Sequence, residues 1–164
     1  MVMERLTRKE NRLKNYTYST ANAYFITICT NNRNNLFWDS SSRGISCPED
    51  IKLSQYGKVV DQAISNIPKY YPAITVDQYV IMPDHVHLLL QINTDEDGRP
   101  MESPKISTVV QQLKGVVSKQ AGFPVWQKGY YDHIVRGEQD YWETRRYIEG
   151  NPVRWIERHC SADS

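Results

Sequence analysis

The chain has 164 residues, enough for one domain with a sizeable core but short for two, and its 40% hydrophobic content is ordinary for a globular protein. No apolar run is long enough to span a bilayer, and the polar N-terminus lacks the apolar centre of a secretory signal. The three cysteines show no CxxC spacing, so neither a disulfide framework nor a thiolate zinc site is expected. We expect a reducing, cytoplasmic location.

The net charge of +1 does not by itself indicate a nucleic-acid binder, but the basic residues are unevenly distributed. Such clusters can follow a phosphate backbone despite a neutral total, although on charge alone a solvated surface explains them better. The candidate backbone contacts are an N-terminal arm within residues 1–20 (Arg5, Arg8, Lys9, Arg12 and Lys14) and a central set (Lys105, Lys114 and Lys119).

The hydrophobic pattern predicts seven elements in chain order. The first four are a strand at 24–30, an amphipathic helix from Tyr56 to Pro68, and strands at 74–82 and 85–92. A second helix follows, with Ser103 as N-cap and Pro104 at its first position, and then a short strand at 131–136. The third helix runs from Glu138 to about Gly150, where Pro152 stops it, and a tail follows at 157–164.

The first six elements predict an α+β fold, a ferredoxin-like βαββαβ sandwich with an antiparallel sheet and two helices on one face. The C-terminal helix is additional, and the opposite face or an edge of the sheet is available to it. One domain spanning residues 1–164 is therefore expected.

Two histidines lie at alternate positions of the strand predicted at 85–92. Side chains alternate along a strand, so His85 and His87 project from one face while Val86, Leu88 and Leu90 project from the other, which must be the core face. Neutral imidazoles are common metal ligands, and two at this spacing can bind one ion. Alone, the His-x-His pattern is weak.

Tyr147 and Asn151 are four residues apart on the last predicted helix, so they share one helix face. An asparagine oxygen can be a third metal ligand, and a tyrosine hydroxyl can act as a nucleophile. On spacing alone, a packed tyrosine and a helix-capping asparagine explain the pair better.

Four segments resemble, in order, the REP-associated tyrosine transposases of the HUH single-tyrosine superfamily. The pair of "MPDHVH" with a "YIxxNPV" pattern is specific, and the matches span about residues 20 to 156. The segments are Asn22–Thr30, Val80–Leu88, Val125–Arg136 and Arg146–Trp155.

The resemblance implies that Tyr147 is the catalytic nucleophile and that His85, His87 and Asn151 hold Mg²⁺ or Mn²⁺. Imidazole ligands favour Mn²⁺, because Mg²⁺ prefers oxygen.

The resemblance also implies cleavage of single-stranded or hairpin DNA through a 5′-phosphotyrosine intermediate, with strand transfer in place of hydrolysis. The protein would be associated with the nucleoid while acting. Whether the tyrosine serves its own chain or a partner in a homodimer is left open. Gly150 departs from the helix former expected there.

Further candidates surround these residues. Arg136, Arg145 and Arg146 are candidate phosphate contacts, or simply solubilise the helix. Asp132 and His133 are candidates for supporting the metal ligands. His133 could also shuttle protons, but a hydrogen-bonded structural role beside the site explains it better. Base stacking is a possible role for Trp126, Tyr130 and Tyr131, with core packing at least as good an explanation. His159 has no assigned role.

Two other functions remain open. A non-catalytic hairpin DNA or RNA binder would keep the fold without activity. A small metal-dependent hydrolase would use the histidines to activate water and would keep its activity in Tyr147→Phe.

Overall fold

The computed structural model describes residues 23–42, 45 and 47–161. Its described strands form one sheet in the order β2-β3-β1-β4, with every neighbouring pair antiparallel. The strands are β1 (Ala23–Cys29), β2 (Ile74–Ile81), β3 (His85–Ile92) and β4 (Tyr131–Val135). The helices are α2 (Gln55–Ser65), α3 (Ile67–Tyr70), α4 (Ile106–Ala121) and α5 (Gly137–Ser161). Three short 3₁₀ turns are η1 (Asn31–Arg33), η2 (Ser40–Ser42) and η3 (Pro48–Asp50). The predicted ferredoxin-like α+β sandwich is confirmed.

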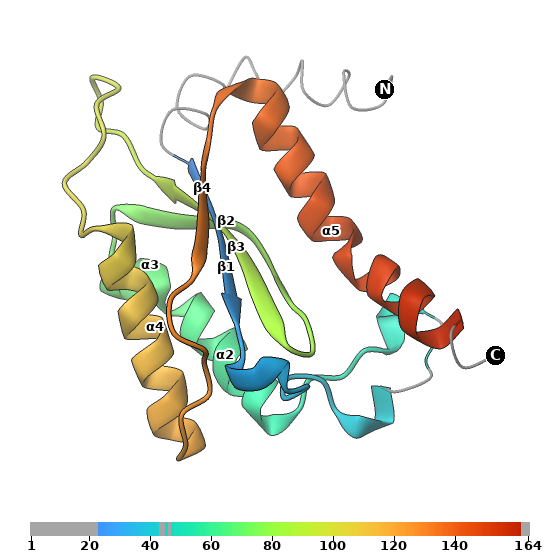
Figure 1. Ribbon diagram of the computed structural model, residues 1–164. Coiled ribbons are helices and arrows are strands. Elements are labelled where there is room, and N and C mark those ends of the chain that lie inside the picture. The colour runs from blue at the N-terminus through green and yellow to red at the C-terminus, as the bar shows by residue number, and fades with distance from the viewer. Residues whose placement is uncertain (1–22, 43–44, 46, 162–164) are drawn as a thin grey trace.

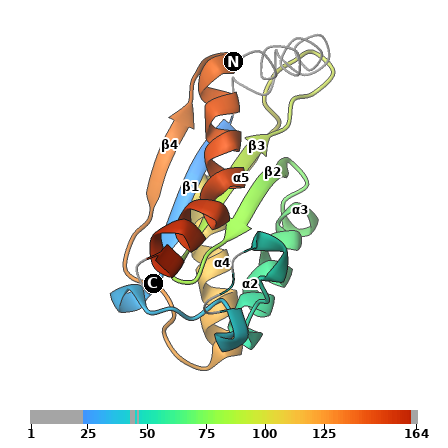
Figure 2. The ribbon, with the colours of Figure 1, turned by 90° about the vertical axis from the view of Figure 1, so that its right-hand side faces the viewer.

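The helices form two layers around this sheet. Helices α2, α3 and α4 lie on one side and α5 lies alone on the other, as the two views show (Figures 1 and 2). The larger hydrophobic core fills the space between the sheet and the α2–α4 layer, where Ile26, Val60, Leu88 and Leu113 are buried together. The additional C-terminal helix thus takes the opposite face of the sheet, one of the two places available to it.

Strand β3 is central and buried along most of its length. Val86, Leu88 and Leu90 belong to the larger core, as their alternation predicts. Leu89 instead belongs to a smaller cluster beneath α5, which also contains Val135 and Ile148. The histidine face of β3 is therefore covered by a second, smaller core and is not left to solvent.

The turn between β2 and β3 is fixed by the segment that follows β1. The carbonyl of Pro83 accepts hydrogen bonds from the backbone N–H groups of Leu36 (2.8 Å) and Phe37 (3.0 Å). The backbone N–H of Thr30 donates to the carbonyl of Asp84 at 2.9 Å. Backbone bonds of this kind hold the start of β3 in place.

Helix α5 does not end where the sequence predicts. It runs to Ser161 with Pro152 inside it, so part of the expected tail at 157–164 is helical. Proline removes one backbone donor and bends a helix, which costs about 3 kcal/mol in a helix interior. The helix changes direction in its second half (Figures 1 and 2), and Ile156 beyond the proline is buried. Burial of that turn helps to offset the cost.

Helix α4 also begins later than expected. Its first residue is Ile106, and Lys105 in extended conformation occupies the N-cap position. The Ser103 hydroxyl donates to the carbonyl of Pro104 at 3.2 Å, so it does not cap the helix. Within the described residues, no helix is both long and apolar enough to cross a membrane.

Tyr141 anchors the first half of α5 to the edge strand β2. Its hydroxyl donates to Asp77 Oδ2 at 2.7 Å, and its ring is buried in the smaller cluster. Burial, together with the Asp77 carboxylate, raises the pKa of Tyr141 to about 12. This contact helps to fix the position of the following turns of α5 over the sheet.

Candidate active site

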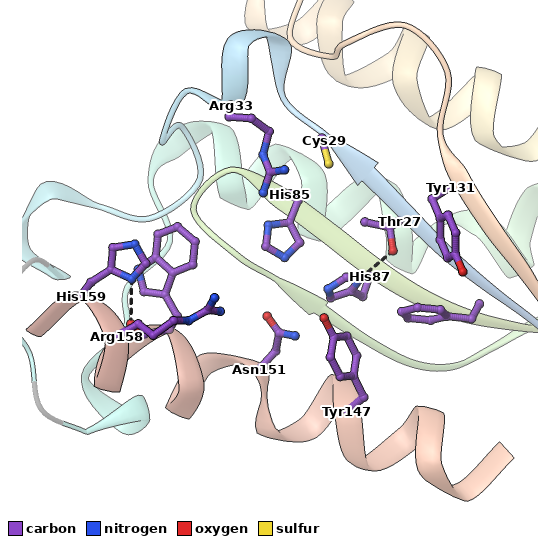
Figure 3. Close-up of a pocket in the computed structure, with 12 residues that line it drawn as sticks. Thr27, Cys29, Arg33, His85, His87, Tyr131, Tyr147, Asn151, Arg158 and His159 are labelled. Atoms are coloured by element: carbon purple, nitrogen blue, oxygen red, sulfur yellow. Dashed lines mark hydrogen bonds between the residues drawn. The ribbon is translucent and has the colours of Figure 1, made fainter. Parts of the chain in front are cut away.

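A cavity of about 590 Å³ lies between α5 and the histidine face of the sheet. Figure 3 shows side chains from β1, β3 and α5 converging on it. No Asp or Glu is among its lining residues, whereas arginine and histidine are, so the cavity suits an anionic ligand. The lining residues are Phe25, Thr27, Cys29, Arg33, His85, His87, Tyr131, Tyr147, Asn151, Trp155, Arg158 and His159.

His85 is oriented by the carboxylate that precedes it. Its Nδ1 lies 2.6 Å from Asp84 Oδ1, and Asp84 Oδ2 accepts a hydrogen bond from Arg33 Nε at 3.0 Å. Burial raises the pKa of Asp84, but its bonds to His85 and Arg33 outweigh burial and hold that pKa below the usual range. A carboxylate on Nδ1 leaves Nε2 of His85 for a ligand in the cavity, as in many metal sites.

His87 is held from the neighbouring strand. Its Nδ1 lies 2.9 Å from the Thr27 hydroxyl, and its ring stacks on Phe25 with centroids 5.2 Å apart. Burial lowers the pKa of His87 to about 3, and the positive charges of His85, Arg154 and Arg33 act in the same direction. The imidazole is therefore neutral near pH 7. Its Nε2 is buried without a hydrogen-bond partner, which is costly unless a ligand uses it.

Tyr147 and Asn151 reach the cavity from one face of α5. Asn151 is 6% exposed, whereas Tyr147 is 47% exposed, so its hydroxyl is accessible to a substrate. The Tyr147 ring lies edge-on to His87, with centroids 5.4 Å apart. One chain thus brings the phenol to its own histidines (Figure 3).

Gly150 makes room for an arginine that holds Tyr147. The Arg154 guanidinium lies 4.6 Å from the centroid of the Tyr147 ring, and its Nη2 donates to the Tyr147 carbonyl at 2.5 Å. A Cβ at position 150 would lie 2.8 Å from Arg154 Nη1. The glycine that departs from the expected helix former therefore accommodates the Arg154 side chain, at a cost in helix propensity of about 1 kcal/mol.

The four central predicted residues all line this one cavity: His85, His87, Tyr147 and Asn151. Among the described residues, no group of three His, Cys, Asp or Glu side chains could hold a metal. A cation here would depend on two imidazoles and the Asn151 oxygen. The neutral His87 with its unpartnered Nε2 fits that donor set, and the imidazole pair suits Mn²⁺ better than Mg²⁺.

The predicted backbone contacts do not gather at the cavity. Lys105 occupies the N-cap position of α4 without a side-chain cap bond, and Lys114 and Lys119 lie on α4, which is on the other side of the sheet from α5 (Figure 1). The Lys114 ammonium donates to the carbonyls of Gln127 (3.0 Å) and Gly129 (2.7 Å), so it holds the loop before β4. The candidates Arg5, Arg8, Lys9, Arg12 and Lys14 lie outside the described residues.

The arginines predicted near α5 are outside the cavity lining as well. Arg145 lies over the rings of Tyr141 and Trp142, 5.9 and 5.6 Å from their centroids. Arg136 is exposed before α5, and Arg146 is half-buried on the helix.

Neither candidate for supporting the metal ligands lines the cavity. Asp132 pairs with Ile26, so it projects from the sheet face opposite the cavity. His133 Nε2 lies 2.8 Å from Asp140 Oδ2, which also accepts from the backbone N–H of Arg136. His133 therefore joins β4 to the first turn of α5.

The three aromatic candidates separate by burial. Trp126 is in the larger core, 5.3 Å from the Phe37 ring, and Tyr130 packs against the same core. Tyr131 is 60% exposed and lines the cavity, so it alone of the three is placed to stack on a base.

The sequence interpretation missed Thr27, Arg33 and Asp84. Thr27 contacts His87 through the β1–β3 register, which hydrophobic periodicity does not give. The adjacency of Asp84 to His85 was a usable signal, because a carboxylate often orients a ligating histidine. Trp155, Arg158 and His159 were missed because the helix was expected to end at Pro152.

No family model matches the chain, but comparison with known proteins finds related sequences and similar solved structures. An uncharacterized protein of Haemophilus influenzae is 34% identical over 175 residues, covering 95% of this chain and 94% of that protein. A second H. influenzae protein, provisionally named a REP-associated tyrosine transposase, is 26% identical and covers 62% of each chain. The REP-associated tyrosine transposase of Escherichia coli is 23% identical over 64% of this chain and 60% of its own length. The chain thus spans about three-fifths of the length of these two named relatives.

A solved structure of a REP-associated tyrosine transposase bound to a REP hairpin has a TM-score of 0.60 at 21% identity, covering 84% of this chain and 70% of that one.

Proposed function

Because the chain is similar in sequence and fold to REP-associated tyrosine transposases, we propose that it is a metal-dependent, single-strand DNA endonuclease and strand transferase with Tyr147 as its nucleophile. The observation that carries the proposal is the convergence of Tyr147, His85, His87 and Asn151 on one cavity without carboxylates. A phosphodiester is an anion, and such a lining favours its entry.

Tyr147 would attack the phosphorus of the DNA backbone through its hydroxyl oxygen. The new bond joins this oxygen to the 5′-phosphate, and the bond from phosphorus to the 3′-oxygen breaks. The phenol gives up its proton and the departing 3′-oxygen gains one. Because the covalent link keeps the energy of the bond, another 3′-hydroxyl can reverse the step, and this is strand transfer.

The chain's other residues would position the tyrosine and the phosphate. Arg154 and the ring of Phe25, 6.0 Å from that of Tyr147, restrict the phenol. Asp84 and Thr27 fix the two imidazoles by their Nδ1 atoms. His85, His87 and Asn151 would hold Mn²⁺ or Mg²⁺, which when bound would supply Lewis-acid neutralisation of the phosphate charge.

We propose hairpin-forming single-stranded DNA as the substrate. The similar solved structure is bound to a REP hairpin, which motivates this choice of probe. A cavity open at Tyr147 can admit one flexible strand more easily than a duplex. Tyr131 at its edge offers an aromatic surface for a base.

The test is a search for a covalent complex. Labelled hairpin oligonucleotides with single-stranded flanks, taken from repeated palindromes of the source genome, are incubated with the protein and Mn²⁺. We expect a denaturant-resistant band whose peptide carries a nucleotide on Tyr147. Tyr147→Phe, which keeps the ring and its contacts, is the matched control and should form none.

Other outcomes would reject the proposal. A wild-type protein that retards DNA but forms no covalent band is a non-catalytic binder. Cleavage that persists in Tyr147→Phe would identify a hydrolase in which the histidines activate water.

A further inference from the structure

Arg33 is an exposed arginine in an unusual backbone setting beside the histidines. It ends η1, directly after β1, and both Asn32 (φ 57°) and Arg33 (φ 54°) have positive φ values. Such conformations cost non-glycine residues of order 1 kcal/mol, so the surrounding structure must impose them. A hydrogen bond from the Thr30 hydroxyl to the Asn34 carbonyl at 2.8 Å closes this turn. The backbone is thus held in the conformation that directs Arg33 toward the cavity.

The guanidinium is held by one nitrogen. Arg33 Nε donates to Asp84 Oδ2 at 3.0 Å, while the other oxygen of that carboxylate holds His85. The side chain of Arg33 is nonetheless 53% exposed and lines the cavity. The Asp84 contact therefore uses Nε and leaves the two Nη groups, whose fixed fork matches two oxygens of a phosphate.

Asp84 also fixes Arg33 and His85 relative to each other. One carboxylate bonds both side chains, so the guanidinium cannot move far without breaking its bond to the group that orients the imidazole. Figure 3 shows Arg33 extending toward His85 from the segment after β1, across the cavity from Tyr147 on α5. Because Arg33, both histidines and Tyr147 line the same cavity, a phosphate held between the histidines and Tyr147 would share that cavity with the Arg33 guanidinium.

We propose that Arg33 binds the phosphate that is to be cleaved, through its Nη groups, and that Asp84 is the positioning residue that holds Arg33 and His85 together. The inference rests on the proposed function for its substrate. A purely structural role, neutralisation of Asp84, is the competing explanation. It would cost stability when Arg33 is changed but would leave phosphate binding unaffected.

Salt dependence of DNA binding separates the two explanations without relying on activity. Affinity for a fluorescein-labelled hairpin oligonucleotide with single-stranded flanks is measured by anisotropy over a range of KCl concentrations, in a Tyr147→Phe background. Loss of one phosphate contact to a single strand reduces the slope of log affinity against log salt by about 0.7. We expect this reduction for Arg33→Gln.

Arg99→Gln is the matched control, since Arg99 is exposed in the loop between β3 and α4, outside the cavity. It removes the same charge and should leave the slope unchanged. Equal slopes for Arg33→Gln and Arg99→Gln would overturn the inference.

Covalent-complex formation gives the second readout, in proteins that keep Tyr147. We expect Arg33→Gln to slow it by about 10²-fold, the scale on which one transition-state contact acts. Arg33→Lys should keep the salt slope but stay about tenfold slow, because an ammonium lacks the fork that bonds Asp84 and phosphate together. Full recovery with lysine would reject that geometry. If the wild type forms no covalent complex, the proposed function fails, while the salt slopes still decide whether Arg33 contacts phosphate.

Discussion

The two faces of the sheet are built from the same strands but differ in what they bury. The face toward α2 and α4 is lined by aliphatic side chains of β1 and β3, which belong to the larger hydrophobic core. The face toward α5 buries a small apolar cluster at one end and His85, His87 and Asn151 at the other. Because successive side chains of β3 point to opposite faces of the sheet, this one strand contributes residues to both faces.

The difference shows how one small domain can combine stability with a reactive site. Burial of apolar area on the α2–α4 face supplies most of the folding free energy. Buried polar groups on the α5 face stabilise little and need partners, and Nε2 of His87 has none. Substitutions on the two faces should therefore affect different measurements.

The largest expected effect comes from His87→Ala on the α5 face. Loss of this imidazole should lower Mn²⁺-dependent formation of the covalent complex by about 10³-fold, since a Lewis acid contributes several kcal/mol to such a step. Single-turnover gels with the hairpin probe measure it. Thermal unfolding should change by only a few degrees, because the ring has few polar bonds to lose. Unchanged Mn²⁺ dependence would show that the imidazole holds no cation.

Leu88→Ala, the next residue on the same strand, should show the opposite pattern. It leaves a cavity in the larger core, where Leu88 is 1% exposed, and should cost about 3 kcal/mol of unfolding free energy. Urea titration followed by circular dichroism measures this loss. At a temperature where the variant is folded, the rate per folded molecule should stay close to wild type. A large loss of rate there would mean that the two faces are not independent.

Alkaline pH should weaken the docking of α5 through Tyr141. Its pKa in the folded protein is about 12, above the ordinary value of 10.0, so the folded state holds the phenolic proton more tightly than the unfolded chain does. The stabilisation is complete below pH 10 and is lost as the pH rises toward 12. After allowance for solvent screening we expect a loss of about 1–2 kcal/mol. Urea midpoints across this range measure it, and Tyr141→Phe should remove this part of the pH dependence.

A pair of glycines gives the smallest and most selective comparison. Gly115 on α4 has open space at its Cβ position, so Gly115→Ala should stabilise the protein by about 0.5–1 kcal/mol without changing activity. Gly150→Ala gains the same helix propensity but displaces Arg154 from Tyr147. We expect covalent-complex formation to fall about threefold to tenfold, a loss of about 1 kcal/mol in positioning. Equal activity in the two variants would show that Arg154 does not position the tyrosine.

Hydrophobic periodicity was sufficient to predict the fold. Strand β3 begins at His85 and ends at Ile92, as predicted, because its alternation is unbroken and Pro83 precedes it. The start of α4 was wrong, since Ser103 and Pro104 resemble a cap although the backbone at Lys105 is still extended. The end of α5 was wrong because local propensity at Pro152 was outweighed by packing of the turns beyond it, an effect that depends on tertiary structure.

The candidate site was predictable where the residues lie in short motifs. His85, His87, Tyr147 and Asn151 were identified from spacing and family resemblance; they line one cavity, and their catalytic and metal-binding roles stay predictions. Thr27 and Arg33 were not, because their contacts depend on strand register and on a turn with positive φ. The structural role of Lys114 was not foreseen, because a lysine that bonds loop carbonyls has the same sequence signature as one that faces DNA.

The turn at Pro83, which backbone hydrogen bonds hold in place, has a consequence for insertions and deletions in the chain. Side chains in a strand repeat every two residues, so an insertion of one residue between Asp84 and His85 would exchange the two faces of β3. The imidazoles would then enter the aliphatic core, and valine and leucine would face α5. Since the backbone of Leu36 and Phe37 fixes where β3 starts, the strand cannot slide to restore the original phase. The hairpin should therefore accept many point substitutions but very few insertions or deletions.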